Sequence, residues 1–134
     1  MRLLLDTNIL LDVFLEREPF VRDAKRLWQA QRDGRISACI VATTVTNLFY
    51  IARRAGGTDR ARMAVRLSLQ TFELISVDRL ALEYADSMPG ADLEDNLQAA
   101  CVTLYKLDGI VTRDARFAGI EALTPTQVLE RLGS

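Results

Sequence analysis

The sequence contains no histidine and only two cysteines among its 134 residues. Without histidine, Ser-His-Asp and Cys-His nucleophile systems, histidine-ligated zinc and histidine general bases are all excluded. Cys39 and Cys101 stand 62 positions apart in apolar runs, with no Cys-x-x-Cys spacing. We expect both thiols to be buried and inert. Chemistry must therefore depend on carboxylates, hydroxyls, lysine, arginine, a cysteine, or a metal ion held by oxygen atoms.

Long hydrophobic runs are also missing. No apolar run approaches the roughly 18 residues of a membrane-spanning helix, and the N-terminal MRLLLDTN lacks the apolar stretch of a signal peptide. No repeat, low-complexity stretch or Pro/Gly-rich linker divides the chain. We therefore expect one cytoplasmic domain over residues 1–134, with no membrane contact, that buries roughly two thirds of its unfolded surface.

The charge is divided unevenly along the chain. Residues 1–66 carry 12 basic and 7 acidic side chains, whereas residues 67–134 carry 5 basic and 11 acidic ones. Fifteen of the 17 basic residues are arginine, which suits bidentate contacts with phosphate. Solvated helix faces are one explanation of this division. The other is a protein that holds both a polyanion and cations.

Short apolar runs alternate with helical patterns. We expect strands at Leu3–Leu5, Ile36–Val41, Phe72–Val77 and Ile110–Thr112. We expect helices over residues 8–15, 20–33, 43–56, 58–71, 78–88, 93–107 and 124–132. Leu93 and Leu97 should face the core. This alternation predicts an α/β fold: a single three-layer domain with a parallel β-sheet of about four to five strands flanked by helices.

Carboxylates stand at the ends of the expected strands. Asp6 follows the first strand, Asp114 follows the last, and Asp92 and Asp95 open the helix that leads into it. Taken singly, each acid has a structural explanation, because Asp6 or Asp114 can cap a turn and Asp92 can be an N-cap. Parallel strands bring all of them to one edge of the sheet, where ligands bind. Clustered carboxylates repel unless a cation joins them, which indicates a hard, oxygen-seeking ion.

Other phosphate-handling motifs are absent. The sequence has no GxxxxGK[ST] and no GxGxxG, and Asp6-Thr7-Asn8 lacks the second aspartate of a phosphotransferase loop. A phospho-receiver needs a late lysine at a strand end, but Lys106 falls inside an expected helix. The chemistry that remains is metal-assisted hydrolysis of a phosphodiester.

The order and spacing of these acids resemble the PIN domain family, which includes the VapC-type toxin ribonucleases. The family's Asp-Thr-Asn after the first strand stands here as Asp6-Thr7-Asn8. Its middle acid falls within residues 92–100, and its last acid lies in Thr112-Arg113-Asp114. The resemblance covers essentially the whole chain, so it also implies the PIN fold.

This resemblance implies a nuclease dependent on Mg2+ or Mn2+, most simply a toxin-like endoribonuclease. The catalytic residues would be Asp6, Asp95 and Asp114, and the metal ligands Asp6, Asp92, Asp95 and Asp114. The residues that would bind substrate or support these ligands are Thr7, Asn8, Asn47, Thr112 and Arg113. Arginines of the first half, such as Arg53, Arg54, Arg60 and Arg62, would steer the RNA backbone. The expected partners are RNA, a small antitoxin and a second copy of the chain in a homodimer.

The sequence departs from the family pattern in two places. Many members carry a glutamate on the helix after the second strand, where Asn47 stands here. The family's Thr-Arg-Asn-x-x-Asp-Phe ending is one residue shorter, with Arg116 before Phe117, so Asp114 is expected to supply the last carboxylate. A neutral Asn47 lowers the affinity for a cation, and Asp92 compensates in this interpretation. The alternative function is a non-catalytic RNA-binding or interaction module of the same fold.

Overall fold

Helices and strands alternate in the structure as the apolar pattern predicts. The structure is a computed structural model that describes residues 1–114, 117 and 119–133, so Arg116 lies outside the described residues. The elements in chain order are β1 (Arg2–Leu5), α1 (Thr7–Phe14), α2 (Val21–Arg32), β2 (Ser37–Val41), α3 (Ala42–Gly56), α4 (Thr58–Thr71), β3 (Glu73–Ile75), α5 (Arg79–Ser87), α6 (Leu93–Leu104), β4 (Gly109–Val111), β5 (Ala122–Leu123) and α7 (Pro125–Arg131).

The strands form one parallel sheet in the order β3-β2-β1-β4-β5. Strand β1 is central and pairs with β2 on one side and with β4 on the other. The chain first adds β2 and β3 outward from β1, and then crosses to add β4 and β5 on the opposite side. The strand order therefore reverses between β1 and β4. Ligands of open α/β sheets bind outside the carboxyl ends of the strands at such a reversal.

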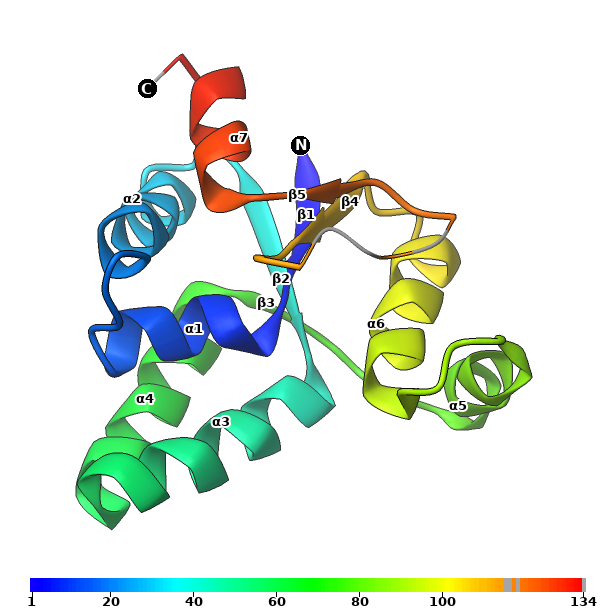
Figure 1. The fold of residues 1–134 in the computed structure, drawn as a ribbon, viewed down its shortest axis with the longest axis horizontal. Coiled ribbons are helices and arrows are strands. Elements are labelled where there is room, and N and C mark those ends of the chain that lie inside the picture. Colours follow the sequence, from blue (N-terminus) through cyan, green and yellow to red (C-terminus); the bar gives the residue numbers. More distant parts are fainter. Residues whose placement is uncertain (115–116, 118, 134) are drawn as a thin grey trace.

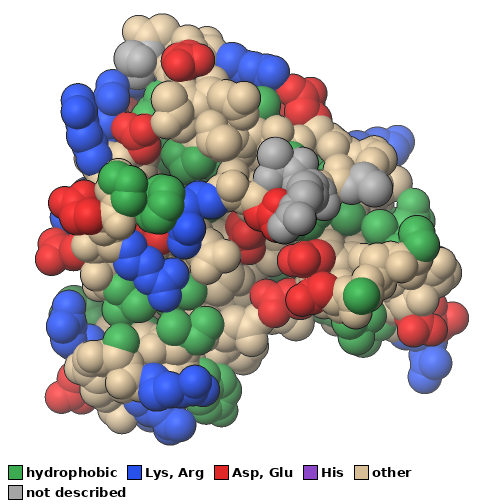
Figure 2. All heavy atoms as spheres, in the orientation of Figure 1, with side chains coloured by type: hydrophobic (Ala, Val, Ile, Leu, Met, Phe, Trp, Pro, Cys, Tyr) green, Lys and Arg blue, Asp and Glu red, His purple; other side chains and the backbone are tan. Residues whose placement is uncertain are grey.

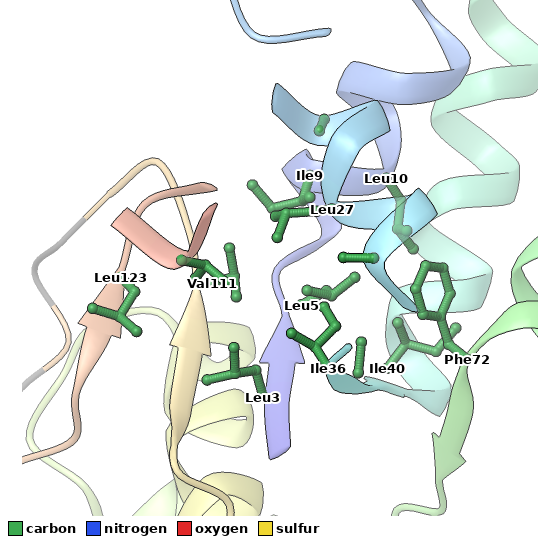
Figure 3. Packing of buried hydrophobic residues seen from close by; sticks show 14 of the residues in the cluster. Leu3, Leu5, Ile9, Leu10, Leu27, Ile36, Ile40, Phe72, Val111 and Leu123 are labelled. Carbon is green, nitrogen blue, oxygen red and sulfur yellow. The ribbon is translucent and has the colours of Figure 1, made fainter. Parts of the chain in front are cut away.

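Two apolar clusters cover the two faces of the sheet and make the domain three-layered. Leu3 and Leu5 of β1 pack with Ile9 and Leu10 of α1 and with Leu27 of α2 (Figure 3). On the opposite face, the cluster is built from Leu4 of β1, from side chains of the other strands, and from α5 and α6. Figure 1 shows α1, α2 and α7 on one side of the sheet and α5 and α6 on the other. The predicted α/β fold is confirmed.

Both cysteines are buried and free, as the sequence predicts. Burial raises the pKa of Cys39 and of Cys101 to about 11, so both thiols stay protonated near neutral pH. No helix in the described part of the chain is long and apolar enough to cross a membrane.

Three details differ from the sequence-based expectation. Strand β5 was not predicted, because two residues are too short to show a period. Helix α6 ends at Leu104, and the following Lys106 takes a positive φ of 54°, so the helix cannot continue to residue 107. Leu97 is 3% exposed as expected, but Leu93 is 53% exposed. Leu93 is the first residue of α6, where the helix has not yet reached the sheet.

Candidate active site

Carboxylates from three separate segments line one cleft at the carboxyl ends of β1 and β4. Asp6 follows β1, Asp114 follows β4, and Glu94 and Asp95 come from the first turn of α6. The cleft has a volume of about 360 Å³. Its other walls are formed by Thr7, Asn8, Leu11, Asn47, Ile51 and Phe117. Figure 2 shows acidic side chains gathered beside the hollow on this face of the molecule.

Two side chains hold the carboxylate of Asp6 in place. The Thr112 hydroxyl donates to Asp6 Oδ2 at 2.9 Å, and Gln98 Nε2 donates to Asp6 Oδ1 at 3.4 Å. Asp6 stands at the N-terminus of α1, but its side chain makes no capping hydrogen bond there. The Thr112 hydroxyl also accepts the backbone N–H of Asp114 at 3.0 Å. One hydroxyl group therefore links the acid after β1 to the acid after β4.

The three acids at the start of α6 lie in different surroundings. Asp92 is the N-cap, and its Oδ1 accepts the backbone N–H of Asp95 at 3.1 Å. Asp92 does not line the cleft but borders an adjoining cavity of about 520 Å³, which Asp95 and Asp114 also reach. Glu94 lies in the cleft itself, with the Thr7 hydroxyl 3.4 Å from its Oε1. Glu94 and Asp95 therefore share the cleft, Asp92 and Asp95 share the adjoining cavity, and the role of Asp92 as a metal ligand stays a prediction.

The cleft concentrates negative charge around Asp95. Burial raises the pKa of the Asp95 carboxyl above its usual value, and the nearby carboxylates of Asp92, Asp6, Glu94 and Asp114 raise that pKa further. Each of these neighbours disfavours a second negative charge at the same place. Together they disfavour the charged form of Asp95.

The donor atoms of the cleft fit a divalent cation by their chemistry. Carboxylate, hydroxyl and amide oxygens are the ligands that Mg2+ and Mn2+ prefer, and a cation would relieve the repulsion around Asp95. Within residues 1–114, 117 and 119–133, however, no three acidic or cysteine side chains converge closely enough to enclose an ion. The acidic side chains line the same cleft, but their carboxylates are too far apart to bind one ion together.

Of the residues expected to support the ligands, all but Thr112 and Arg113 line the cleft. Asn8 and Asn47 reach it from α1 and α3, and Asn47 is half-buried there beside Ile51. Thr112 is buried and acts through its hydrogen bond to Asp6. Arg113 points instead at α1, where its Nε donates to Asp12 Oδ2 at 2.9 Å. The guanidinium of Arg113 is thus occupied by a protein carboxylate.

Sequence reasoning missed the roles of three polar residues, namely Glu94, Gln98 and Asp12. Glu94 and Gln98 are four residues apart, so the helical period places both on the face of α6 that looks toward Asp6. Asp12 interrupts an apolar helix, a pattern that indicates a buried charge with a partner. A larger cavity of about 740 Å³ lies elsewhere, between α1, α2 and α4, and the residues given for its lining include no aspartate or glutamate.

The sequence and the structure were each compared with those of known proteins. The family model described as "PIN domain" matches residues 2–116. A chain of a toxin-antitoxin complex from Klebsiella pneumoniae is 28% identical, with a TM-score of 0.68 over 92% of this chain and 97% of that one. None of the curated proteins matches the sequence significantly.

Two more distant structures share the fold. VapC20 of Mycobacterium tuberculosis, described as a Sarcin-Ricin loop cleaving toxin, is 16% identical with a TM-score of 0.73, covering 88% of this chain and 95% of that one. VapBC2 of Rickettsia felis, bound to a DNA fragment from its promoter, is 14% identical with a TM-score of 0.66, covering 92% and 98%.

Proposed function

Because this chain belongs to the PIN domain family, we propose that it is a metal-dependent ribonuclease, a toxin-like endoribonuclease that hydrolyses phosphodiester bonds. The observation that carries the proposal is the cleft at the strand reversal, which is lined by the acids that follow β1 and β4 together with two acids of α6. The likeness to a chain of a toxin-antitoxin complex and to a toxin that cleaves the Sarcin-Ricin loop supports the same activity.

In this proposal Asp6, Asp95 and Asp114 hold a Mg2+ or Mn2+ ion, and Glu94 adds negative charge beside them. When bound, such an ion lowers the pKa of a coordinated water and offsets the charge that develops on the scissile phosphate. Asp92 would be the fourth ligand, and it also caps α6 and so fixes the helix that carries Asp95.

The remaining groups of the cleft orient the reactants. Thr112 and Gln98 hold both oxygens of Asp6, so the plane of that carboxylate is fixed before substrate arrives. The amides of Asn8 and Asn47 on the cleft wall can donate to a phosphate oxygen or to the attacking water. No histidine takes part, which agrees with a sequence that has none.

The RNA backbone needs positive charge near this acidic cleft. The arginines expected to supply it lie exposed on α3 and α4, namely Arg53, Arg54, Arg60 and Arg62. Figure 2 shows basic side chains at the end of the molecule where α3 and α4 meet. These arginines would attract RNA in a manner that weakens with salt. Because Arg113 is paired with Asp12, the proposal does not assign it to this surface.

A protein partner follows from the same comparison. The similar Klebsiella chain comes from a toxin-antitoxin complex, so we expect a toxin that a small antitoxin silences. The cytoplasmic location and the homodimer stay predictions from the family resemblance. Expression of this chain alone should then stop bacterial growth. Co-expression of the protein encoded by a neighbouring gene should restore growth. Unimpaired growth with soluble, active protein would favour a housekeeping nuclease.

One observation favours a second function. Asn47 lines the cleft at the place where the family pattern carries a glutamate, which removes one negative charge from the expected ligands. A PIN-fold module that binds RNA without cleaving it would tolerate this change. Such a module would retain RNA in a filter-binding assay and release no fragments with Mn2+.

The test is cleavage of a mixed single-stranded RNA pool with Mn2+ and with EDTA. The wild type should cleave only with metal. Asp6→Asn, Asp95→Asn and Asp114→Asn should each fold within about 1 kcal/mol of wild type, since asparagine is isosteric, and lose activity by about 100-fold or more. The matched control is Asp86→Asn on the exposed surface of α5, which should keep full activity. Equal activity in all five proteins would overturn the proposal.

A further inference from the structure

Asp12 is a fully buried carboxylate in the apolar middle of α1. It is 0% exposed and follows the core residues Ile9, Leu10 and Leu11. Burial raises the pKa of Asp12, although Arg113 and then Arg17 lower it. A charge in such a place persists only when well-placed partners compensate the loss of water. The nuclease chemistry described above makes no use of Asp12, so the carboxylate needs its own explanation.

The partner of Asp12 is Arg113, whose guanidinium donates two hydrogen bonds to the Asp12 carboxylate. Arg113 Nε donates to Oδ2 at 2.9 Å, and Arg113 Nη2 donates to Oδ1 at 3.3 Å. The guanidinium also lies 4.0 Å from the centre of the Phe20 ring, and Arg17 Nη1 stands 3.9 Å from Asp12 Oδ1. A two-pronged bond on one edge and an aromatic ring on one face fix the position of the Arg113 side chain.

The fixed side chain belongs to the residue directly before Asp114. Beyond Val111 the chain leaves β4, and Asp114 lies in no helix or strand. Two consecutive side chains therefore set the path of the backbone there: Thr112 bonds to Asp6, and Arg113 bonds to Asp12. The Asp12–Arg113 pair joins α1 to this segment across 101 positions of sequence.

We propose that Asp12 is a positioning residue, which holds Arg113 and thereby places the Asp114 carboxylate in the cleft. Arg113 is then an anchor for the end of β4 and not a contact for RNA. This inference rests on the proposed function for its catalytic consequence. Its structural part, the hold of Asp12 on the segment from Thr112 to Asp114, stands independently and is measured separately.

The structural part is tested by hydrogen exchange at the backbone N–H of Asp114, which donates to Thr112. Asp12→Asn keeps the size of the side chain and removes the charge that holds Arg113. Arg113→Lys keeps the positive charge but loses the two-pronged geometry and the stacking on Phe20. In both variants, at a temperature where circular dichroism shows them folded, exchange at Asp114 should accelerate by about 10-fold or more. Unchanged exchange in either folded variant would overturn the proposal.

The catalytic part is tested by Mn2+ affinity, measured by isothermal titration, and by RNA cleavage. Both variants should lose about 10- to 100-fold in Mn2+ affinity and in kcat, with KM for RNA unchanged. The double variant should be no worse than the more impaired single one, since both act through one pair. The control is Glu83→Gln, a glutamate on α5 paired with Arg79 at the surface, which should change neither quantity.

The outcomes separate the two proposals. A raised KM with unchanged Mn2+ affinity in Arg113→Lys would show that Arg113 binds RNA, and would overturn the positioning role. A wild type that cleaves no RNA would refute the proposed function, whereas exchange at Asp114 would still decide whether Asp12 holds the segment. Faster exchange with full Mn2+ affinity would show a contact that only stabilises the fold, and would also overturn the positioning of Asp114.

Discussion

The Thr112 hydroxyl links two acids of the cleft, so its removal has a calculable effect. Thr112→Val is nearly isosteric and leaves no cavity. It deletes a hydrogen bond of 2.9 Å to the charged Asp6, and such bonds contribute about 1.5–3 kcal/mol. Asp6 is half-buried, so the lower part of that range applies. Asp114 is exposed, so water can replace the bond that its N–H loses, and this adds little.

The expected loss for Thr112→Val is therefore about 2 kcal/mol of unfolding free energy. For a chain of 134 residues this corresponds to a decrease in Tm of about 7 °C. The assay is thermal unfolding followed by circular dichroism in EDTA. Thr103→Val on α6 is the control, because its hydroxyl only bonds back to Ala99 O at 3.4 Å, and its Tm should change by less than about 2 °C.

Thr112→Val should also reduce metal-dependent cleavage, since Asp6 and Asp114 both lose their orientation. A Tm within about 1 °C of wild type would refute the reasoning, because it would mean that the hydroxyl does not support the Asp6 carboxylate in solution.

Three further predictions concern the acids and Asn47. Asn47→Glu adds a carboxylate to the cleft and should tighten Mn2+ binding in a titration, whereas Asn47→Ala should leave the Tm nearly unchanged. Because the pKa of Asp95 is raised in the folded state, its protonated form stabilises the fold, and this contribution is lost as the pH rises through the raised pKa, above 3.8. In metal-free urea titrations, wild type should thus lose stability relative to Asp95→Asn as the pH rises above 3.8; parallel curves would refute this. Mn2+ at about 100 times its Kd should stabilise the wild type by about 2.7 kcal/mol, and an unmoved melting curve would count against an assembled site.

Much of the fold could be predicted because the local patterns are strong. Leu3–Leu5 reads as a continuous apolar run, and all three side chains are buried in the central strand. Strand β5 was not predicted from the sequence, because it is an edge strand of only two residues whose conformation depends on its pairing with β4. The prediction that Leu93 faces the core was wrong, because helical spacing alone does not show where a helix begins to contact the sheet.

The site could be predicted in outline but not in its supporting contacts. Asp6 and Asp114 were predictable because parallel strands place their carboxyl ends at one edge of a sheet. The hydrogen bond between Gln98 and Asp6 spans 92 positions, and no local pattern encodes it. Asp92 was equally compatible with a cap and a ligand. Its hydrogen bond to the Asp95 N–H shows the cap, and its role as a ligand stays a prediction.

The central claim is that the carboxylates of the cleft hold a divalent cation. The most direct measurement is the anomalous difference map of a crystal soaked in Mn2+. The account predicts a peak among Asp6, Asp95 and Asp114, with carboxylate oxygens within about 2.0–2.3 Å of the ion, and no such peak in Asp95→Asn. A map without density in the cleft at saturating Mn2+, or with its only peak at Asp86 or another surface acid, would contradict the account.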